Sequence, residues 1–437
     1  MLPMTLAEIA ATVGGRIDGD PAVLVTGPAY LDSRRPVDGG LFVALTGARV
    51  DGHDHASAAH AVLGTRPTGR PAVLVTDAVV ALGRLARHVV ATVRPRVAVV
   101  TGSHGKTTTK DLLAGLLPGA VATEGNLNNE LGVPLTCLRL HRGDRDLVLE
   151  AGARGVGHLS YLADLARPHI ACVTGLGSAH LGAFGSAALL AEAKGELVEA
   201  LPAGGVAVLP AEEPRAAAMA ARTQADVLTF GRDRGEVSAG EVTLDDLARP
   251  AFLLRHDGRT APVRLALVGV HAVHSALAAA ACALAAGQAL EDVAHRLTDA
   301  RPGAAHRLQP RRRADGLLVL DDTYNANPEA ALVALQALAH VARQRGGRAV
   351  AVLGPMHELG PSSAAAHAAV GRAARSLGVA VLGVGAGADG YGGEWVADQD
   401  GATARLQHVG STDTVLVKAS RSVRLDLLVE ELLRDAG

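Results

Sequence analysis

Apolar, β-branched runs alternate along this chain with Ala- and Leu-rich stretches, and this alternation limits the possible folds more than any other feature. Four such runs (VAVVTG, DLVLEAG, IACVTG and GVAVLP) lie between residues 95 and 303, and four more (GLLVLDDT, RAVAVLG, GVAVLGVG and DTVLVKAS) follow residue 304. Buried strands that alternate with helices are typical of parallel sheets with helices on both faces. We therefore predict an α/β fold with two mostly parallel sheets, whose ligands would bind beyond the carboxyl ends of the strands.

The 437-residue chain is long enough for several domains, since one domain typically takes about 150 residues. Residues 1–94 mix short strands with helices and end at the joint VRPR. Residues 95–303 form the first alternating unit, and the segment TDARPGAAHR leads into the second, residues 304–437. We predict three domains with these bounds. The charge run PRRRADG, residues 310–316, is expected to form a solvated turn.

Composition excludes several classes of function. A net charge of −2 and an aromatic content of 2% do not suit nucleic-acid binding, which needs basic patches or stacking platforms. The cysteines, Cys137, Cys172 and Cys282, lie far apart in apolar segments, which is typical of buried, reduced thiols. The chain begins with a capped helix (Thr5 and Glu8) rather than a signal peptide, and its longest apolar helical run is too short to span a membrane. We expect a soluble, cytoplasmic protein without nucleic-acid partners or membrane insertion.

The segment TGSHGKTTTK directly follows the apolar run RVAVV and precedes a helical pattern. A helix entered through glycines directs free backbone N–H groups at an anion. Gly102 and Gly105 would allow close approach of phosphates, Lys106 offers a cation, and the Thr107 hydroxyl can ligate Mg²⁺. Only two residues separate the glycines, where the usual P-loop has four, so the match to a P-loop is partial. The alternative is a glycine-rich turn followed by a surface lysine.

Four further polar clusters stand at predicted strand ends or on helices. Glu150 ends the run DLVLE, where a carboxylate could hold Mg²⁺ or cap a helix. His180 follows the run IACVTG, and a lone histidine there is as often structural as a ligand. Lys194 lies in a helical pattern that would ordinarily place it at the surface. Residues 320–330, LDDTYNANPEA, hold more polar groups than a turn needs before Pro328 opens a helix, which favours ligand contact.

Eight segments of the chain, taken in order, resemble the Mur ligases. These segments are TGSHGKTTTK, TEGNLNNELGVPLTCLRL, VLEAGARGVGHL, GSAHLGAFGS, AKGELVEAL, DDTYNANPEA, LGPMHELG and VKASR. NLNNELGVP, YNANP and the early segment LDSRRPVDGGLFVALTGARVDGHDH are most similar to the branch that adds D-alanyl-D-alanine. The resemblance covers nearly the whole chain, and the short glycine spacing is normal in this family.

The resemblance implies an N-terminal α/β UDP-binding domain, a central P-loop-type ATPase domain and a C-terminal Rossmann-like domain. It also implies a reaction: ATP phosphorylates the terminal carboxylate of UDP-N-acetylmuramoyl-tripeptide, and the amine of D-alanyl-D-alanine attacks the acyl phosphate. A monomer is expected. Two alternatives stay open. One is a specialised relative that joins another amino acid or dipeptide to a different carboxylate, and the other is a non-catalytic UDP-sugar-binding relative.

The resemblance further implies roles for individual residues. Lys106, His180 and Lys194 are the expected catalytic residues, and Thr107, Glu150, His180 and Lys194 are the expected metal ligands. Lys194 matches a lysine that family members carbamylate, so two Mg²⁺ sites are expected. Besides Lys106 and Thr107, the expected nucleotide contacts are Gly102, Ser103, Gly105, Thr108, His271, Arg307, Asp322 and Asn325. The expected substrate contacts are Ser33, Arg34, Asn128, Asn129, Tyr324 and Asn327.

One departure from the family pattern concerns the nucleotide base. The family's helix after the ATPase core usually places side-chain amides beside the adenine. Here that helix reads HAVHSAL, and Ala272 and Ser275 stand where amides are expected. We therefore expect weakened recognition of adenine with the phosphate and metal groups intact.

Overall fold

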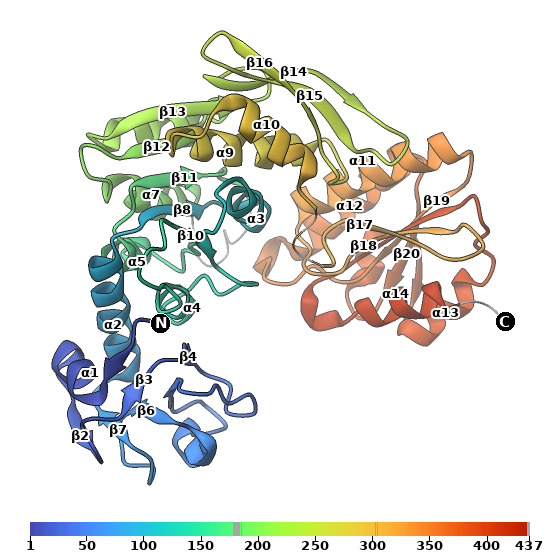
Figure 1. Cartoon of the computed structure of the whole chain (residues 1–437). Helices are drawn as coiled ribbons and strands as arrows, with labels where there is room; N and C mark the ends of the chain where they lie inside the picture. Colours follow the sequence, from blue (N-terminus) through green and yellow to red (C-terminus); the bar gives the residue numbers. More distant parts are fainter. Residues whose placement is uncertain (178–183, 185, 302, 304, 435–437) are drawn as a thin grey trace.

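The structure is a computed structural model that describes the whole chain apart from residues 178–183, 185, 302, 304 and 435–437. Three sheets dominate it and occupy successive parts of the chain (Figure 1). The α/β prediction with mostly parallel sheets is confirmed. The predicted domain bounds fall between the sheets and stay predictions.

The first sheet has five strands and belongs to the N-terminal lobe. In spatial order it contains β2 (Arg16–Asp18), β7 (Ala72–Leu74), β6 (Ala61–Gly64), β5 (Leu41–Val43) and β4 (Ala29–Tyr30). A separate pair consists of β1 (Met4–Thr5) and β3 (Leu24–Val25), and the helices are α1 (Leu6–Val13) and α2 (Ala78–Val93). The predicted cap of α1 is confirmed, because the Thr5 side chain accepts from the Glu8 N–H while Glu8 accepts from the Thr5 N–H. Helix α2 leads from this lobe to the central sheet (Figure 1).

The central sheet has nine strands. In spatial order they are β16 (Arg259–Arg264), β15 (Pro250–His256), β14 (Val237–Leu244), β13 (Asp226–Gly231), β12 (Val206–Pro210), β11 (Ile170–Val173), β8 (Arg96–Thr101), β10 (Asp146–Glu150) and β9 (Val121–Ala122). The helices of this region are α3 (Lys106–Leu116), α4 (Gly132–Cys137), α5 (His158–Ala166), α7 (Ala187–Glu199), α8 (Pro214–Ala217), α9 (His271–Ala285) and α10 (Leu290–Asp299). Successive residues of β8 pack into two different hydrophobic clusters, so both faces of the sheet are buried, as expected of a parallel sheet.

Strands β14, β15 and β16 extend this sheet with an antiparallel meander that the sequence analysis did not predict. The turn between β15 and β16 contains Asp257 and Gly258, with φ of 48° and 69°. An Asp-Gly pair between two apolar runs is a strong hairpin signal, so the missed meander was detectable from the sequence.

The third sheet has six strands, of which β17 alone is antiparallel to its neighbour. In spatial order they are β17 (Gln309–Arg312), β18 (Leu318–Asp322), β22 (Thr414–Lys418), β19 (Ala349–Leu353), β20 (Ala380–Val384) and β21 (Glu394–Val396). The helices are α11 (Pro328–Arg345), α12 (Ser363–Ser376), α13 (Gln399–Leu406) and α14 (Asp426–Leu433). Pro328 opens α11, as predicted.

The prediction of a solvated turn over residues 310–316 is wrong for its first half. Pro310 and Arg311 belong to the edge strand β17, and the turn begins only at Arg313. An edge strand tolerates proline because one side of it needs no hydrogen-bond donor. Arg311 also finds a partner, because its guanidinium bonds Glu430 of α14. Neighbouring contacts, rather than local charge, therefore decide the structure of this segment.

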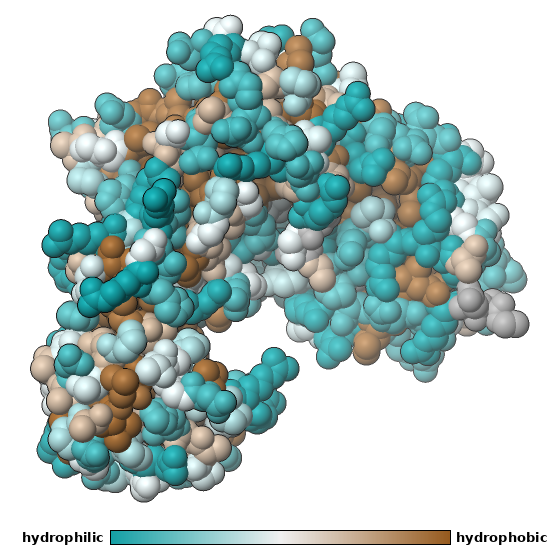
Figure 2. All heavy atoms as spheres, in the orientation of Figure 1, coloured by the Kyte–Doolittle hydropathy of each residue, from teal (hydrophilic) through white to brown (hydrophobic). Residues whose placement is uncertain are grey.

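The three cysteines are free and buried, as predicted. Among the described residues, no helix is long and apolar enough to cross a membrane. The space-filling view shows a wide opening between the N-terminal lobe and the lobe of the six-stranded sheet, with mainly hydrophilic side chains around it (Figure 2).

Candidate active site

The glycine-rich segment of residues 102–105, the predicted phosphate loop, leads from β8 into helix α3. Helix α3 begins at Lys106, and Gly105 precedes it in a left-handed conformation. Gly102 has a φ of 148°, and a Cβ there would collide with the Thr174 hydroxyl. Glycine is therefore required at position 102. The Ser103 N–H donates to the Gly175 carbonyl (2.8 Å), which anchors the loop to the segment after β11.

Two lysines meet at this loop. The ammonium of Lys106 donates to the Gly102 carbonyl (2.9 Å), and the ammonium of Lys194 donates to the same oxygen (3.0 Å). Lys194 is only 3% exposed, so the surface position that its helical pattern suggested is wrong. Burial, together with the nearby charge of Lys106, holds the pKa of Lys194 well below its ordinary value. Helix α7 thus positions the buried amine of Lys194 beside the phosphate loop.

Glu150 ends β10, as predicted, and its side chain is buried beside the loop. One carboxylate oxygen, Oε1, accepts a hydrogen bond from Asn128 Nδ2 (2.7 Å). The other, Oε2, is buried and has no hydrogen-bond partner among the described residues. Leaving a buried carboxylate oxygen unpaired is costly, and a hard divalent cation would satisfy it. The donor set of Glu150 and the Thr107 hydroxyl therefore fits Mg²⁺.

The segment that leads into the C-terminal sheet contributes the guanidinium group of Arg307, 200 residues after Thr107. Arg307 Nη2 donates to Thr107 Oγ1 (3.1 Å), and its guanidinium carbon lies 4.2 Å from the centre of the Tyr324 ring. Its Nε is buried and has no hydrogen-bond partner in the described part of the chain. Arg307 therefore joins the C-terminal sheet region to the phosphate loop.

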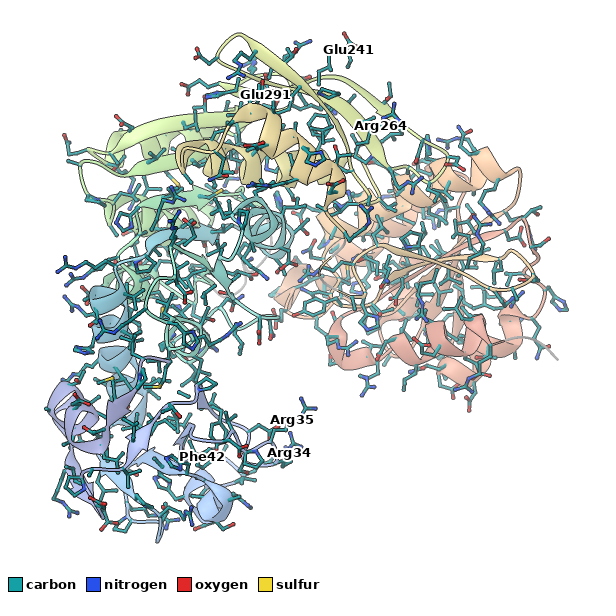
Figure 3. All side chains as sticks on the ribbon, in the orientation of Figure 1. Arg34, Arg35, Phe42, Glu241, Arg264 and Glu291 are labelled. Carbon is teal, nitrogen blue, oxygen red and sulfur yellow. The ribbon has the colours of Figure 1, made fainter. Side chains whose placement is uncertain are left out.

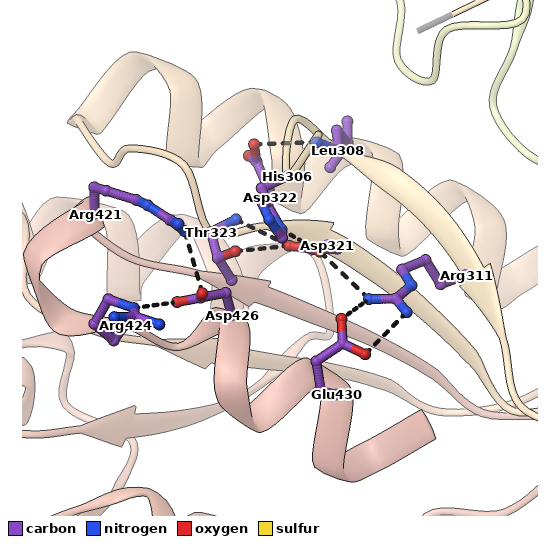
Figure 4. Close-up of polar contacts among 10 residues, drawn as sticks. All are labelled: His306, Leu308, Arg311, Asp321, Asp322, Thr323, Arg421, Arg424, Asp426 and Glu430. Atoms are coloured by element: carbon purple, nitrogen blue, oxygen red, sulfur yellow. Dashed lines mark hydrogen bonds and ion pairs between the residues drawn. The ribbon is translucent and has the colours of Figure 1, made fainter. Parts of the chain in front are cut away.

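Two aspartates at the end of β18 hold the segment that carries Arg307 (Figure 4). Asp322 accepts from the Leu308 N–H (3.1 Å) and from Lys418 Nζ (2.6 Å). Asp321 accepts from His306 Nδ1 (2.7 Å) on the other side of Arg307. Burial raises the pKa of Asp322, although the charge of Lys418 opposes this. Asp321 lies in the predicted polar cluster of residues 320–330, whereas Lys418 and His306 had no individually predicted role.

Three asparagines that were predicted to contact nucleotide or substrate form hydrogen bonds with nearby backbone N–H groups. Asn129 accepts from two N–H groups at the start of α4, Asn327 caps α11, and the Asn325 side chain accepts from the Ala326 N–H. Thr108 is half-buried on α3, and His271 is exposed at the start of α9. His180 lies outside the described residues.

The predicted UDP contacts lie on the N-terminal lobe, away from the phosphate loop. Ser33 is half-buried, whereas Arg34 is exposed and pairs with Asp32 (2.8 Å). Arg34 and Arg35 lie on the side of that lobe that faces the opening (Figure 3). The structure thus leaves space between these arginines and the site at Lys106, Glu150 and Arg307.

Ala272 and Ser275, the positions where amides were expected, lie on the buried side of helix α9. Ala272 and Ser275 are 1% and 4% exposed, and Ser275 Oγ lies 3.2 Å from the position of a Cβ on Gly105. His274 points to the end of β11, where its Nε2 bonds the Thr174 carbonyl (2.6 Å), and its ring lies 5.0 Å from that of Phe230. The His274 imidazole therefore already contacts protein groups through its Nε2 and its ring.

Two family models match most of this architecture. The Mur ligase middle domain matches residues 100–283, and the Mur ligase, glutamate ligase domain matches residues 306–421. The chain belongs to the Mur ligase family. Together the two matches cover the phosphate loop, Glu150, Lys194, Arg307 and Lys418.

Similar proteins within the family point to one branch. The UDP-N-acetylmuramoyl-tripeptide–D-alanyl-D-alanine ligase of Mycobacterium tuberculosis is 41% identical, over 100% of this chain and 98% of the relative. A crystal structure of MurF from Acinetobacter baumannii superposes with a TM-score of 0.89 at 32% identity, covering 99% of each chain. A MurF ligase from Thermotoga maritima, in complex with ADP, has a TM-score of 0.82 at 29% identity and covers 93% of this chain and 97% of its own. The predicted resemblance is confirmed.

Proposed function

We propose that this chain joins D-alanyl-D-alanine to UDP-N-acetylmuramoyl-tripeptide, an ATP-dependent peptide ligation in peptidoglycan precursor synthesis that releases ADP and phosphate. The observation that carries the proposal is the convergence of Lys106, Glu150, Lys194 and Arg307 at one phosphate loop. Similarity to ligases of this reaction over the whole chain supports it.

A carboxylate is a poor acyl donor, so phosphorylation is needed to supply a leaving group. The negative phosphate and carboxylate then have to approach each other, and cations lower that barrier. Lys106 and Arg307 are proposed to contact the transferred phosphate. Support comes from their hydrogen bonds to the Gly102 carbonyl and to the Thr107 hydroxyl, both at the phosphate loop. The amine of D-alanyl-D-alanine would then attack the acyl phosphate through a tetrahedral intermediate.

Magnesium would bind through Thr107 and Glu150, and a carbamate on Lys194 would hold a second ion; His180 stays a predicted ligand. The metal would supply charge neutralisation between nucleotide and substrate carboxylate. Support for the second site is the burial of Lys194, whose Nζ donates to the Gly102 carbonyl and has no carboxylate partner in the described part of the chain. Ser33 and Arg34 are proposed to bind the UDP end across the opening.

The deciding experiment is phosphate release by the purified protein with each substrate omitted in turn. We expect release only when ATP, a UDP-muramoyl-tripeptide and D-alanyl-D-alanine are all present. Release with a different dipeptide or carboxylate would favour a specialised relative. Absence of release despite binding of the UDP-sugar would favour a non-catalytic relative.

Asn128 offers a test of the metal site. Because its amide donates to Glu150 Oε1, it orients the carboxylate so that Oε2 stays available. We expect Asn128→Leu, which keeps the size but removes the donor, to weaken Mn²⁺ binding to the ADP complex by about 10–100-fold. Electron paramagnetic resonance of free Mn²⁺ measures this affinity without turnover.

The neighbouring Asn129 supplies the matched control. Its side chain accepts from the Leu131 and Gly132 N–H groups, so Asn129→Ala should cost about 1 kcal/mol of stability and leave the Mn²⁺ affinity unchanged. Equal losses of affinity in both variants would refute the positioning role of Asn128.

The nucleotide base gives a further prediction. Side-chain amides contribute about 0.5–1.5 kcal/mol for each hydrogen bond, and none stands at Ala272 or Ser275. We expect a raised KM for ATP and tolerance of GTP, with little change in kcat because the phosphate groups are intact. KM values for both nucleotides, in wild type and in Ala272→Asn and Ser275→Asn, test this. Rejection of GTP by a hundredfold or more in wild type would contradict it.

A further inference from the structure

A groove of about 970 Å³ lies at the amino ends of β8 and β11, whereas the phosphate loop follows the carboxyl end of β8. It is lined by the ends of α2, α5 and α7 and by the residues that lead into β8 and β11. Its volume is within the range of small-molecule sites, about 300–1,000 Å³. One of the helices that border it, α2, connects the N-terminal lobe to the central sheet (Figure 1). Neither Lys106 nor Lys194, the two described residues among those predicted for catalysis, lines this groove.

Two arginines at the groove adopt a backbone conformation that disfavours them. Arg94 and Arg167 follow α2 and α5 with φ of 57° and 50°, in the left-handed region. A side chain in this region crowds its own backbone, which is why helices so often end in glycine there. The chain follows that rule at Gly14 and Gly346, after α1 and α11. Arg94 and Arg167 depart from the rule, and both line the same groove.

Neither guanidinium at the groove has a hydrogen-bond or ion-pair partner within the described ranges. Arg424 is also left-handed, with a φ of 62°, but its guanidinium donates to Asp426 (3.1 Å). Strained backbone positions are a recognised feature of functional sites. Arg94 and Arg167 combine a left-handed backbone with a guanidinium group that has no partner in the described part of the protein.

None of the acidic side chains of the groove pairs with these arginines, because each bonds another group. The engaged pairs are Asp164 with Arg87 (2.7 Å), Glu199 with Arg222 (2.7 Å), and Glu196 with the backbone N–H groups of Gly157 and Ser160. Backbone N–H groups carry no net charge, so Glu196 remains an anion in the groove, and Arg94 and Arg167 together leave one positive charge in excess. Its remaining lining includes the buried apolar residues Val90, Ala163 and Leu201.

We propose that this groove binds a small, soluble, amphiphilic anion: a carboxylate or phosphate ester attached to an apolar body. Arg94 and Arg167 bind the anionic group, and the apolar residues of α2, α5 and α7 cover the body. Guanidinium groups suit both anions because their paired N–H donors match carboxylate and phosphate oxygens. Arg94 lies between α2 and β8, and Arg167 follows α5. An anion bound by both arginines would therefore connect these two parts of the chain.

The test uses the full-length protein with saturating ADP and Mg²⁺, so that the nucleotide site is filled. The probe is 1-anilinonaphthalene-8-sulfonate, an anion on an apolar body, followed by its fluorescence. We expect binding at one site per chain, and a rise in Kd of about tenfold or more in Arg94→Gly and in Arg167→Gly. Because glycine suits both positions, neither variant should unfold at a lower temperature than wild type.

Displacement of the probe identifies the ligand chemistry. Hexyl phosphate and hexanoate should displace it and their relative potencies decide between ester and carboxylate, whereas hexanol at the same concentration should not. Arg424→Gly, away from the groove, should leave the Kd unchanged. The proposal is overturned if the probe does not bind, if hexanol competes equally, or if both groove variants keep the wild-type Kd. It is equally overturned if those variants bind normally but lose stability, since the arginines would then act only as helix caps.

Discussion

Lys106→Ala is expected to lower kcat by at least about 100-fold while the protein stays folded. Lys106 stands at the start of α3, and its ammonium donates to the Gly102 carbonyl. In a closed site an ammonium aimed at developing negative charge stabilises the transition state by several kcal/mol, about as much as one oxyanion-hole donor. Loss of that group removes stabilisation specific to the transferred phosphate.

The measurement is phosphate release under saturating substrates, with thermal unfolding as the check on folding. Lys106→Met is the matched variant, because it keeps the apolar stem of the side chain and removes only the charge. Both variants should lose kcat to a similar extent. Near-normal turnover in either would contradict the assignment of residues 102–106 as the loop that binds the nucleotide phosphates.

Local sequence patterns were sufficient to predict the strand and the helix that carry Glu150 and Lys106. The strand that ends at Glu150 and the helix that begins at Lys106 follow from apolar runs and glycine positions within ten residues, and both are confirmed. The structural reason is that strand ends and helix starts depend mainly on nearby residues. The direction in which Glu150 faces its partner Asn128, 22 residues earlier, does not follow from such patterns.

Contacts between residues far apart in the sequence explain why local patterns did not predict the positions of Arg307, Lys194 and strand β17. Arg307 reaches Thr107 across 200 residues, and Lys194 reaches Gly102 across 92. Periodicity placed Lys194 on the surface because it cannot tell which faces of a helix other elements will cover. Only the resemblance to the Mur ligases singled out Lys194 before the structure did. The edge strand β17 was missed for the same reason, since its pairing with β18 outweighs its charges.

Lys194→Ala should be nearly inactive, with a loss of kcat of at least about 100-fold. Lys194 is buried at the phosphate loop, and its role is proposed to be that of a carbamate, an anion that holds a second Mg²⁺. Without it, the phosphate and the substrate carboxylate would meet with one metal fewer to neutralise them. The truncation leaves space where the side chain was, so short carboxylates such as acetate are expected to restore part of the rate.

Lys194→Met distinguishes the carbamate from simple packing, because it fills the same space without an amine. We expect it to be as inactive as Lys194→Ala and to gain nothing from acetate. Carbon-13 NMR of protein equilibrated with labelled bicarbonate should show a carbamate signal in wild type that is absent from both variants. The absence of that signal in wild type, together with turnover that does not change when carbon dioxide is removed, would contradict the proposal. In that case Lys194 would act as an amine that supports the Gly102 carbonyl, and Lys194→Met would then lose activity without any change in the number of bound metal ions.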